Sequence, residues 1–439
     1  MQTAADVDAA VTKARDAQRH HALPAWRRAE ILTTCSNLID ERREDLAQII
    51  AKEAAKPITT ARVEVARALS TLGLAGIEAR KIGGHVLPMD GSMVGEGKLA
   101  YTTRVPCGIV GAISPFNFPL NLVAHKVGPA IAAGCPIVLK PASQTPLSAL
   151  ALADLLRESG LPEGWLNVVT GSGSEVGNAI VEHPDIAAIS FTGSAEVGWD
   201  IPRRAPRKRV GLELGNSTPI IIEADGDWEE AAYGIAAGGF NHAGQSCISV
   251  QRVYVQREIA EPFTAMLVDL VENLELGDPL REETNVSALI SEGDRDRVHS
   301  WIHEAVQQGA VLECGGEIRG SLLTPAVLTN TNLDMLVCKD EVFGPVVAVQ
   351  TYDSLHEAIA LANGTRYGLQ AGIYTQDIDS ALLASQALEF GGVLINEVPT
   401  WRADLMPYGG VKDSGNTREG PAYAVETFTD LRLVVLNLG

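Results

Sequence analysis

The segment Gly108-Ile109-Val110-Gly111-Ala112-Ile113 is a short, continuous apolar run, and it decides the fold. Such a run, without polar residues in alternation, predicts a strand that is buried on both faces. Similar runs follow at 137–139, 166–169 and 186–191, and the first two intervals have the apolar spacing of helices, at 123–133 and 148–159. Buried strands that alternate with helices predict a mostly parallel sheet covered by helices, that is, an α/β fold.

The same alternation resumes after about Leu212. A helix is expected to begin at Asp227, with Glu230 three residues further on, and to continue to Phe240. Further strands are expected at 252–255, 346–349, 371–374 and 393–395, and helices at 263–274, 297–308, 355–362 and 378–388. Before the first strand, only helical spacing is found, and we expect helices at 5–17 and 26–50.

Two further segments read as strands outside these units. Residues 99–105 alternate like a half-exposed strand, and residues 431–436 form an apolar strand at the tail with no following turn to pair it locally. An unpaired terminal strand invites aggregation unless another sheet or subunit covers it. We therefore expect an oligomer.

Composition excludes several classes of protein. A chain of 439 residues is expected to form two or three domains. Its formal net charge of -20 disfavours nucleic acids and anionic membranes as partners. No apolar run reaches the roughly 20 residues of a membrane helix, and no secretory signal is found. Six scattered cysteines without paired spacing argue against a disulfide framework or a metal site and favour the cytoplasm.

The loops after the first strands suit a phosphate-bearing ligand. They begin near Ser114, Lys140, Thr170 and Thr192 and contain glycines, hydroxyls and one lysine. Ligands of parallel sheets bind beyond the carboxyl ends of the strands, and helix N-termini favour anions. None of these loops has the G-x-G-x-x-G pattern, and each taken singly is more often a plain turn.

A single cysteine stands in Gly244-Gln245-Ser246-Cys247-Ile248, just after a helix of small residues. A lone cysteine is more often a small buried hydrophobe than a catalyst. Its interpretation as a nucleophile depends on the motifs that surround it in the chain.

Six motifs in register resemble the aldehyde dehydrogenase superfamily. They are Asn117 in PFNFP, Lys140 in LKPAS, FTGS at 191–194, Glu213 in LELGN, Cys247 in GQSC, and Glu341 with Phe343 in EVFGP. The resemblance covers nearly the whole chain and implies two Rossmann-type αβα domains plus a small β oligomerisation arm. It assigns 1–98 and 107–211 to a cofactor-binding domain, to which 410–424 returns, 212–409 to a catalytic domain, and 99–106 with 425–439 to the arm. The oligomer would be a homodimer or homotetramer.

The resemblance assigns the chemistry to three residues. A Cys247 thiolate would add to the aldehyde, and the thiohemiacetal would lose hydride to leave a thioester. Asn117 and the Cys247 backbone N–H would donate to the oxyanion, and Glu213 would activate the hydrolytic water. Asn117 has an alternative role as a turn residue, and Glu213 as a salt-bridged carboxylate. Because Glu213 lies in an apolar segment, we expect a raised pKa.

The cofactor implied is NAD or NADP. Lys140 would contact the adenosine ribose, Glu341 the nicotinamide ribose, and Phe343 the ring, although Lys140 has the alternative of a solvated charge. The other expected contacts are Ser114, Phe116, Gly173, Gly177, Gly193, Ser194 and Leu214. An acidic residue three positions after Lys140 would repel a 2′-phosphate, but Ser143 stands there. We therefore expect NADP to be accepted.

The run 397–415 resembles the lactaldehyde and phosphonoacetaldehyde dehydrogenase subgroup. Expected substrate contacts are Phe118, Ser246, Trp401 and Arg402. Arg402 would pair with the tail of the substrate or, alternatively, with Glu397 or Asp404. Phosphonate-oxidising relatives have an arginine and a histidine where this chain has Ser246 and Phe118. We therefore expect a small neutral or hydroxylated aldehyde such as lactaldehyde, with succinate semialdehyde or a phosphonoacetaldehyde-type acidic aldehyde as the alternative.

Two departures from the family pattern stand out. Members usually have a β-rich stretch before the first helix, which this chain lacks, and we expect effects on stability and cofactor affinity. Phe116 replaces a common tryptophan. CoA-acylating relatives lack the hydrolytic glutamate, and a non-catalytic relative would lack Cys247, Glu213 or Asn117. This chain has all three residues, which favours a hydrolytic enzyme.

Overall fold

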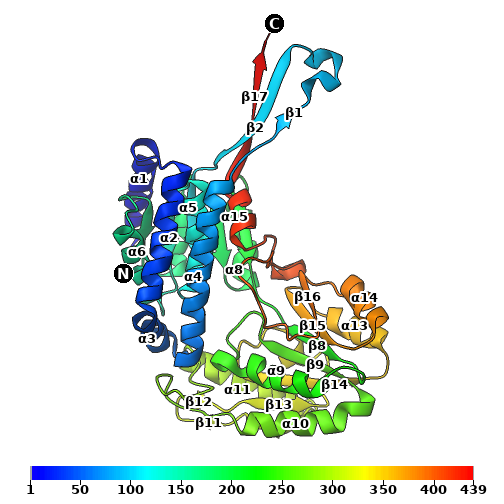
Figure 1. The fold of residues 1–439 in the computed structure, drawn as a ribbon. Helices are drawn as coiled ribbons and strands as arrows, with labels where there is room; N and C mark the ends of the chain where they lie inside the picture. Colours follow the sequence, from blue (N-terminus) through cyan, green and yellow to red (C-terminus); the bar gives the residue numbers. More distant parts are fainter. Residues whose placement is uncertain (1, 439) are drawn as a thin grey trace.

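The computed structural model describes residues 2–438 and contains two large sheets, each lying between layers of helices (Figure 1). A narrow antiparallel sheet projects from one end of the molecule. The α/β fold expected from the apolar runs is confirmed. None of the helices within the described residues is long and apolar enough to cross a membrane.

The first sheet is fully parallel, with the strand order β5-β4-β3-β6-β7. Its strands are β3 (Ile109–Ile113), β4 (Ile137–Lys140), β5 (Leu166–Val168), β6 (Ile186–Thr192) and β7 (Arg209–Glu213). The four predicted strands are confirmed, and every residue of β4 is buried. β7 was not predicted, because Arg209 and Glu213 at its ends interrupt the apolar run.

Helices cover both faces of this sheet. One face carries α2 (Ala25–Glu41), α4 (Ile58–Lys81), α5 (Asn121–Ala133), α6 (Leu147–Glu158) and α15 (Pro421–Thr427). The other carries α1 (Ala4–His20), α7 (Asn178–Glu182) and α8 (Ala195–Arg204). The prediction of one helix over 26–50 is wrong, because Arg42 breaks it into α2 and α3 (Arg43–Ala54) with φ −113° and ψ 26°. The break was missed because apolar residues continue at helical spacing on both sides of it.

The second sheet has the order β10-β13-β14-β9-β8-β15-β16, and only β10 runs antiparallel to its neighbour. Its strands are β8 (Thr218–Ile222), β9 (Val250–Gln256), β10 (Val311–Cys314), β13 (Ala326–Thr329), β14 (Val346–Tyr352), β15 (Gln370–Tyr374) and β16 (Gly392–Ile395). Its helices are α9 (Trp228–Phe240), α10 (Ala260–Glu272), α11 (Glu292–Gln307), α13 (Leu355–Asn363) and α14 (Ile378–Ala387). The predicted elements are confirmed, with ends shifted by a few residues, whereas β8, β10 and β13 were not predicted.

The projecting sheet has the order β1-β2-β17, formed by β1 (Val86–Leu87), β2 (Lys98–Pro106) and β17 (Thr429–Asn437). The tail strand therefore pairs within its own chain, with Val434 opposite Tyr101. Its other edge has no partner strand among the described residues. Leu431, Leu433 and Val435 on this strand are 61%, 57% and 46% exposed.

Candidate active site

Cys247 lies on a tight loop between the small-residue helix α9 and the central strand β9. The loop begins with a short turn, η4 (Asn241–Gly244), in which His242 and Ala243 have left-handed backbones. Gly244 also has a positive φ of +70°, and a β-carbon there would lie 2.1 Å from the carbonyl oxygen of Gly344. Only glycine fits this approach, which holds the residues before Cys247 against the segment that carries Gly344.

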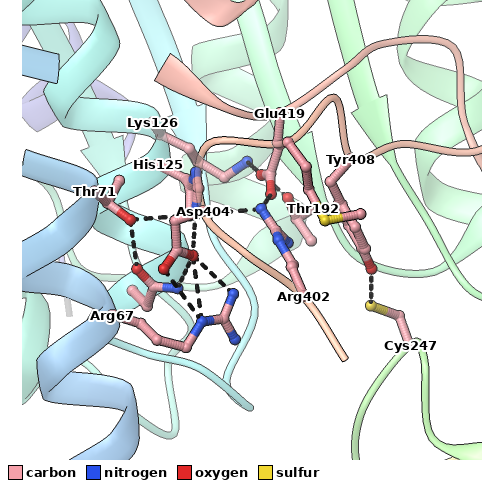
Figure 2. A network of polar contacts seen from close by, with 12 residues as sticks. Arg67, Thr71, His125, Lys126, Thr192, Cys247, Arg402, Asp404, Tyr408 and Glu419 are labelled. Atoms are coloured by element: carbon pink, nitrogen blue, oxygen red, sulfur yellow. Dashed lines mark hydrogen bonds and ion pairs between the residues drawn. The ribbon is translucent and has the colours of Figure 1, made fainter. Parts of the chain in front are cut away.

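The Cys247 Sγ lies 2.9 Å from the Tyr408 hydroxyl (Figure 2). Burial raises the pKa of the Cys247 thiol to about 12, while the hydrogen bond from Tyr408 and the charge of Arg402 act in the opposite direction. Burial also raises the pKa of Tyr408 well above 10, so its hydroxyl keeps its proton and is able to donate.

Asn117 is buried beside the Cys247 loop, as the motif order suggested. It follows β3, and its Nδ2 donates to the backbone oxygen of Gln245 over 2.9 Å. An amide nitrogen carries two hydrogens, so one remains for a second acceptor. Its Oδ1 has no hydrogen-bond partner among the described residues. Both the turn position and the oxyanion role are compatible with this geometry.

Glu213 stands at the carboxyl end of β7 and is buried, with no hydrogen-bond partner for either oxygen in the described part of the chain. The salt-bridged alternative is therefore wrong for this structure. Burial raises the pKa of Glu213 well above 4.5, and the nearby Glu419 charge raises it further. The carboxyl lines a small cavity with His125 and Glu419, separate from the cavity at Cys247.

The Arg402 side chain is buried, and its Nη2 lies 2.9 Å from an oxygen of Glu419 (Figure 2). The expected alternative partners were wrong, because Asp404 pairs instead with Arg67 at 2.8 Å and His125 at 3.0 Å. The side chain of Glu397 accepts from the backbone N–H of Val398. The Arg402 guanidinium also lies 3.7 Å from the centre of the Tyr408 ring.

A cavity of about 390 Å³ opens above Cys247. All four expected substrate contacts line it, namely Phe118, Ser246, Trp401 and Arg402. Sequence reasoning missed other residues that line it, among them Glu64, Arg67, His242 and Tyr408. Tyr408 could have been identified from the sequence, because it lies in the run 397–415 that carries the subgroup resemblance. Arg67 lies on a helix without a motif and had no such signal.

A second cavity, of about 560 Å³, lies at the carboxyl end of the first sheet and is lined by Gly173 and Gly177. A β-carbon on Gly173 would meet nothing within 4 Å, so the backbone is open to a ligand. Nearby, the Lys140 side chain passes 3.7 Å from the position of a Gly177 β-carbon. The Ser114 hydroxyl is buried without a hydrogen-bond partner among the described residues. These features fit a dinucleotide with its phosphates at the backbone.

Glu341, Phe343 and Phe116 are three of the remaining expected cofactor residues. Glu341 and Phe343 come from the second domain, and the Phe343 ring meets Phe116 edge to face at 5.7 Å. Glu341 accepts from the backbone N–H of Asn216 over 3.1 Å, and burial raises its pKa to about 7.

Four further expected cofactor residues already have contacts within the protein. The Gly193 N–H donates to the backbone carbonyl of Glu213, Ser194 caps α8, and Leu214 packs where a β-carbon on Gly198 would lie. The Ser143 hydroxyl donates to the Gly171 carbonyl over 2.8 Å.

The chain forms two αβα units, Cys247 lines one cavity, and a second cavity lies at the carboxyl end of the first sheet. This arrangement is typical of cofactor-dependent α/β oxidoreductases. Residues 1–434 match the model of the Aldehyde dehydrogenase family, and the chain belongs to that family. It is an enzyme that acts on aldehydes.

Several named proteins and solved structures are similar to this chain. The chain is 46% identical to a 3-sulfolactaldehyde dehydrogenase of Priestia aryabhattai, covering 99% of this chain and 91% of that protein. It is 41% identical to a lactaldehyde dehydrogenase of Methanocaldococcus jannaschii, over 94% of this chain and 89% of that protein. The structure of aldehyde dehydrogenase 21 from Physcomitrella patens with the product succinate has a TM-score of 0.96 and 38% identity, covering 100% and 91% of the two chains.

The cofactors of the solved relatives differ. A glyceraldehyde-3-phosphate dehydrogenase from Methanocaldococcus jannaschii complexed with NADP has a TM-score of 0.95 and 39% identity, covering 99% of this chain and 95% of that one. An NAD-dependent aldehyde dehydrogenase from Sinorhizobium meliloti has a TM-score of 0.96 and 37% identity, covering 100% and 88%. The family therefore uses NAD or NADP.

Proposed function

We propose that this enzyme oxidises a short hydroxylated aldehyde, of the lactaldehyde type, to its carboxylic acid with NAD or NADP. The observation that carries the proposal is the charge balance around the cavity above Cys247. Three charged side chains line it, and each is paired with an opposite charge: Arg67 with Asp404, Arg402 with Glu419, and Glu64 with the buried Lys56. A cavity without net charge favours a neutral polar substrate over an anion.

Oxidation begins at Cys247. Its thiolate forms a bond to the aldehyde carbon, and the carbonyl electron pair moves to the oxygen. The Asn117 amide and the Cys247 backbone N–H donate to this oxyanion, which stabilises the tetrahedral centre. A bound nicotinamide would supply the hydride acceptor, and Lys140, Glu341 and Phe343 would hold the dinucleotide. Once the tetrahedral centre has lost hydride, the acyl group remains on sulfur as a thioester.

Hydrolysis of the thioester requires a base, and we assign this role to Glu213. Its pKa is raised well above 4.5 by burial, so near neutral pH it takes a proton from water more readily than an ordinary carboxylate. Because Glu213 lines a neighbouring cavity, its side chain has to turn toward Cys247 to reach the water. The product acid then leaves and frees the sulfur.

The second candidate substrate is an acidic aldehyde. Arg67 and Arg402 both line the cavity, and a relative at 46% identity is named for a sulfonated aldehyde. An anion would have to draw one arginine away from its carboxylate, which costs part of a buried ion pair. The neutral hydroxylated aldehyde requires no such exchange.

Other features of the chain support the expected cofactor, oligomeric state and cellular compartment. Ser143 places no negative charge near a 2′-phosphate, which supports the use of NADP. The exposed apolar residues of β17 support a homodimer or homotetramer assembled through the arm. Six cysteines, all free in the structure, suit the cytoplasm.

The test is an aldehyde panel with both cofactors, followed at 340 nm. Lactaldehyde, propanal, succinate semialdehyde, phosphonoacetaldehyde and 3-sulfolactaldehyde should be compared by kcat/KM. We expect lactaldehyde to be among the best substrates and Cys247→Ala to abolish oxidation. A kcat/KM for every anionic aldehyde well above that for lactaldehyde would overturn the substrate assignment. Oxidation that survives in Cys247→Ala would overturn the mechanism.

A further inference from the structure

Tyr408 is held rigidly beside the nucleophile. It is 3% exposed, and its ring packs with Ile248 and Leu369. Its backbone forms an antiparallel bridge with Glu419, whose N–H donates to the Tyr408 carbonyl over 2.6 Å. Packing and the bridge together fix the direction of the phenol, which points at Cys247 (Figure 2).

The distance of 2.9 Å between the Tyr408 hydroxyl and the Cys247 Sγ is that of a hydrogen bond. It is the one side-chain hydrogen bond that Cys247 makes within the described residues. Either atom can donate while the cysteine is a thiol. When the cysteine is a thiolate, only the phenol has a hydrogen, so Tyr408 must be the donor.

Arg402 lies against the Tyr408 ring and strengthens the hydrogen bond from Tyr408 to Cys247. Its guanidinium lies 3.7 Å from the centre of the Tyr408 ring, where a cation is attracted by the π face. It also draws electron density from the phenol and makes the O–H a stronger donor. Arg402 stays in place because Glu419 holds it at 2.9 Å and His125 lies at 3.2 Å.

We propose that Tyr408 is a catalytic residue of aldehyde oxidation, which donates a hydrogen bond to the Cys247 thiolate and so raises the fraction of reactive sulfur. This inference rests on the proposed role of Cys247 as the nucleophile. The thiol loses its proton to solvent water, and Tyr408 keeps its own. As sulfur bonds to the aldehyde carbon, negative charge passes to the carbonyl oxygen and the hydrogen bond to sulfur weakens.

The test is the pH dependence of Cys247 alkylation by iodoacetamide, measured on the full-length enzyme without aldehyde. Mass spectrometry of the peptide that contains Cys247 separates it from the other cysteines. We expect Tyr408→Phe to move the alkylation profile to higher pH and to slow alkylation near neutral pH roughly tenfold, since a thiolate without a donor is less stable. Tyr423→Phe, on an exposed tyrosine of α15, should change neither.

A second measurement guards against a fold defect in Tyr408→Phe. Incorporation of 3-fluorotyrosine at position 408 leaves the side-chain shape nearly unchanged and makes the phenol a stronger donor. It should move the alkylation profile to lower pH. Profiles that stay unchanged in both variants would overturn the inference. Because no aldehyde is present, this result is independent of whether Cys247→Ala abolishes oxidation, which tests the proposed function.

Discussion

The Arg402 guanidinium and the Glu419 carboxylate form an ion pair inside the protein, 2.9 Å apart, with both side chains less than a tenth exposed (5% and 7%). Lys126 lies 3.9 Å from the other oxygen of Glu419. Figure 2 shows that the pair lies between the His125 and Asp404 cluster and Tyr408. The Glu419 charge therefore acts on both the cavity at Cys247 and the buried Glu213.

Glu419→Gln should lower the pKa of Glu213. Burial is the largest cause of the raised Glu213 pKa, and the negative charge of Glu419 is the next. Removing that charge, while Arg402 and Lys126 stay positive, favours the ionised form of Glu213. If Glu213 is the hydrolytic base, the acid limb of the kcat profile should move to lower pH. Steady-state kcat between about pH 5 and about pH 8 measures this limb.

The matched control for this change is Glu426→Gln, on a side chain that is 68% exposed and lies 3.7 Å from Arg104. It should leave the profile unchanged. A shift of the acid limb to higher pH in Glu419→Gln would contradict the electrostatic argument. Melting temperatures of both variants are needed, because an unpaired buried Arg402 is expected to destabilise the fold.

Much of the fold could be predicted, because a buried strand is recognised from a local run of apolar residues. Ile137, Val138 and Leu139 are apolar in succession, and the strand they predict is buried on both faces. β7 was missed for the same physical reason, since Arg209 and Glu213 hide a strand whose centre alone is apolar. The signal is local, so it fails where the ends of an element are charged.

Residues of the candidate site were likewise predicted where a local motif marks them and missed where none does. Asn117 and Cys247 were found because each stands in a short motif, and the structure places Asn117 against the loop that carries Cys247. The ion-pair partners of the charged residues were not predicted, because tertiary contacts determine which side chains meet. Arg67 and Asp404 are 337 positions apart, and neither has a local pattern that names the other.

Ser143→Asp should reduce the use of NADP. The Ser143 hydroxyl now donates to the Gly171 carbonyl, and the position three before it is the buried Lys140. A carboxylate there would repel a 2′-phosphate and cost roughly 1.4 kcal/mol or more through solvent, about a tenfold loss. The ratio of kcat/KM for NADP to that for NAD should fall about tenfold or further. An unchanged ratio would mean that position 143 does not face the adenosine ribose.

Acid should destabilise the enzyme through two buried histidines. Burial lowers the pKa of both His125 and His242 below 6.5, with Arg402 and Lys56 adding to the effect. In the unfolded chain each imidazole regains its ordinary pKa near 6.5, so the unfolded state binds more protons below that pH. Stability is thus complete above about pH 6.5 and falls as pH decreases, by up to about 1.4 kcal/mol per pH unit for each histidine.

Replacing one of these groups should flatten that dependence. His242→Phe removes one imidazole that must be neutral in the fold, so its melting temperature should fall less between neutral pH and about pH 5 than that of the wild type. His356→Gln, on an exposed histidine, is the control and should keep the wild-type slope. A slope that is equal in all three proteins would show that His242 does not stay neutral in the fold.

Lys56→Met should destabilise the protein strongly, because it leaves a buried carboxylate without its counter-ion. Lys56 and Glu64 form an ion pair in which both side chains are 0% exposed. Glu64 also accepts the backbone N–H groups of Leu120 and Asn121, at 2.9 and 3.1 Å, at the start of α5. Breaking such a pair costs about 3–5 kcal/mol, which should lower the urea midpoint of unfolding clearly.

The double variant Lys56→Met with Glu64→Gln separates charge from packing. A glutamine is neutral and still offers an oxygen to the two N–H groups, so the double variant should recover most of the lost stability. Lys13→Met is the control, because its partner Glu163 lies 3.4 Å away and the two side chains are 60% and 88% exposed. Exposed pairs contribute little, and its urea midpoint should not move. If the double variant were as unstable as Lys56→Met alone, the loss would come from the missing ammonium over the Phe118 ring, which lies 3.7 Å from the ring centroid, and not from an unpaired Glu64 charge.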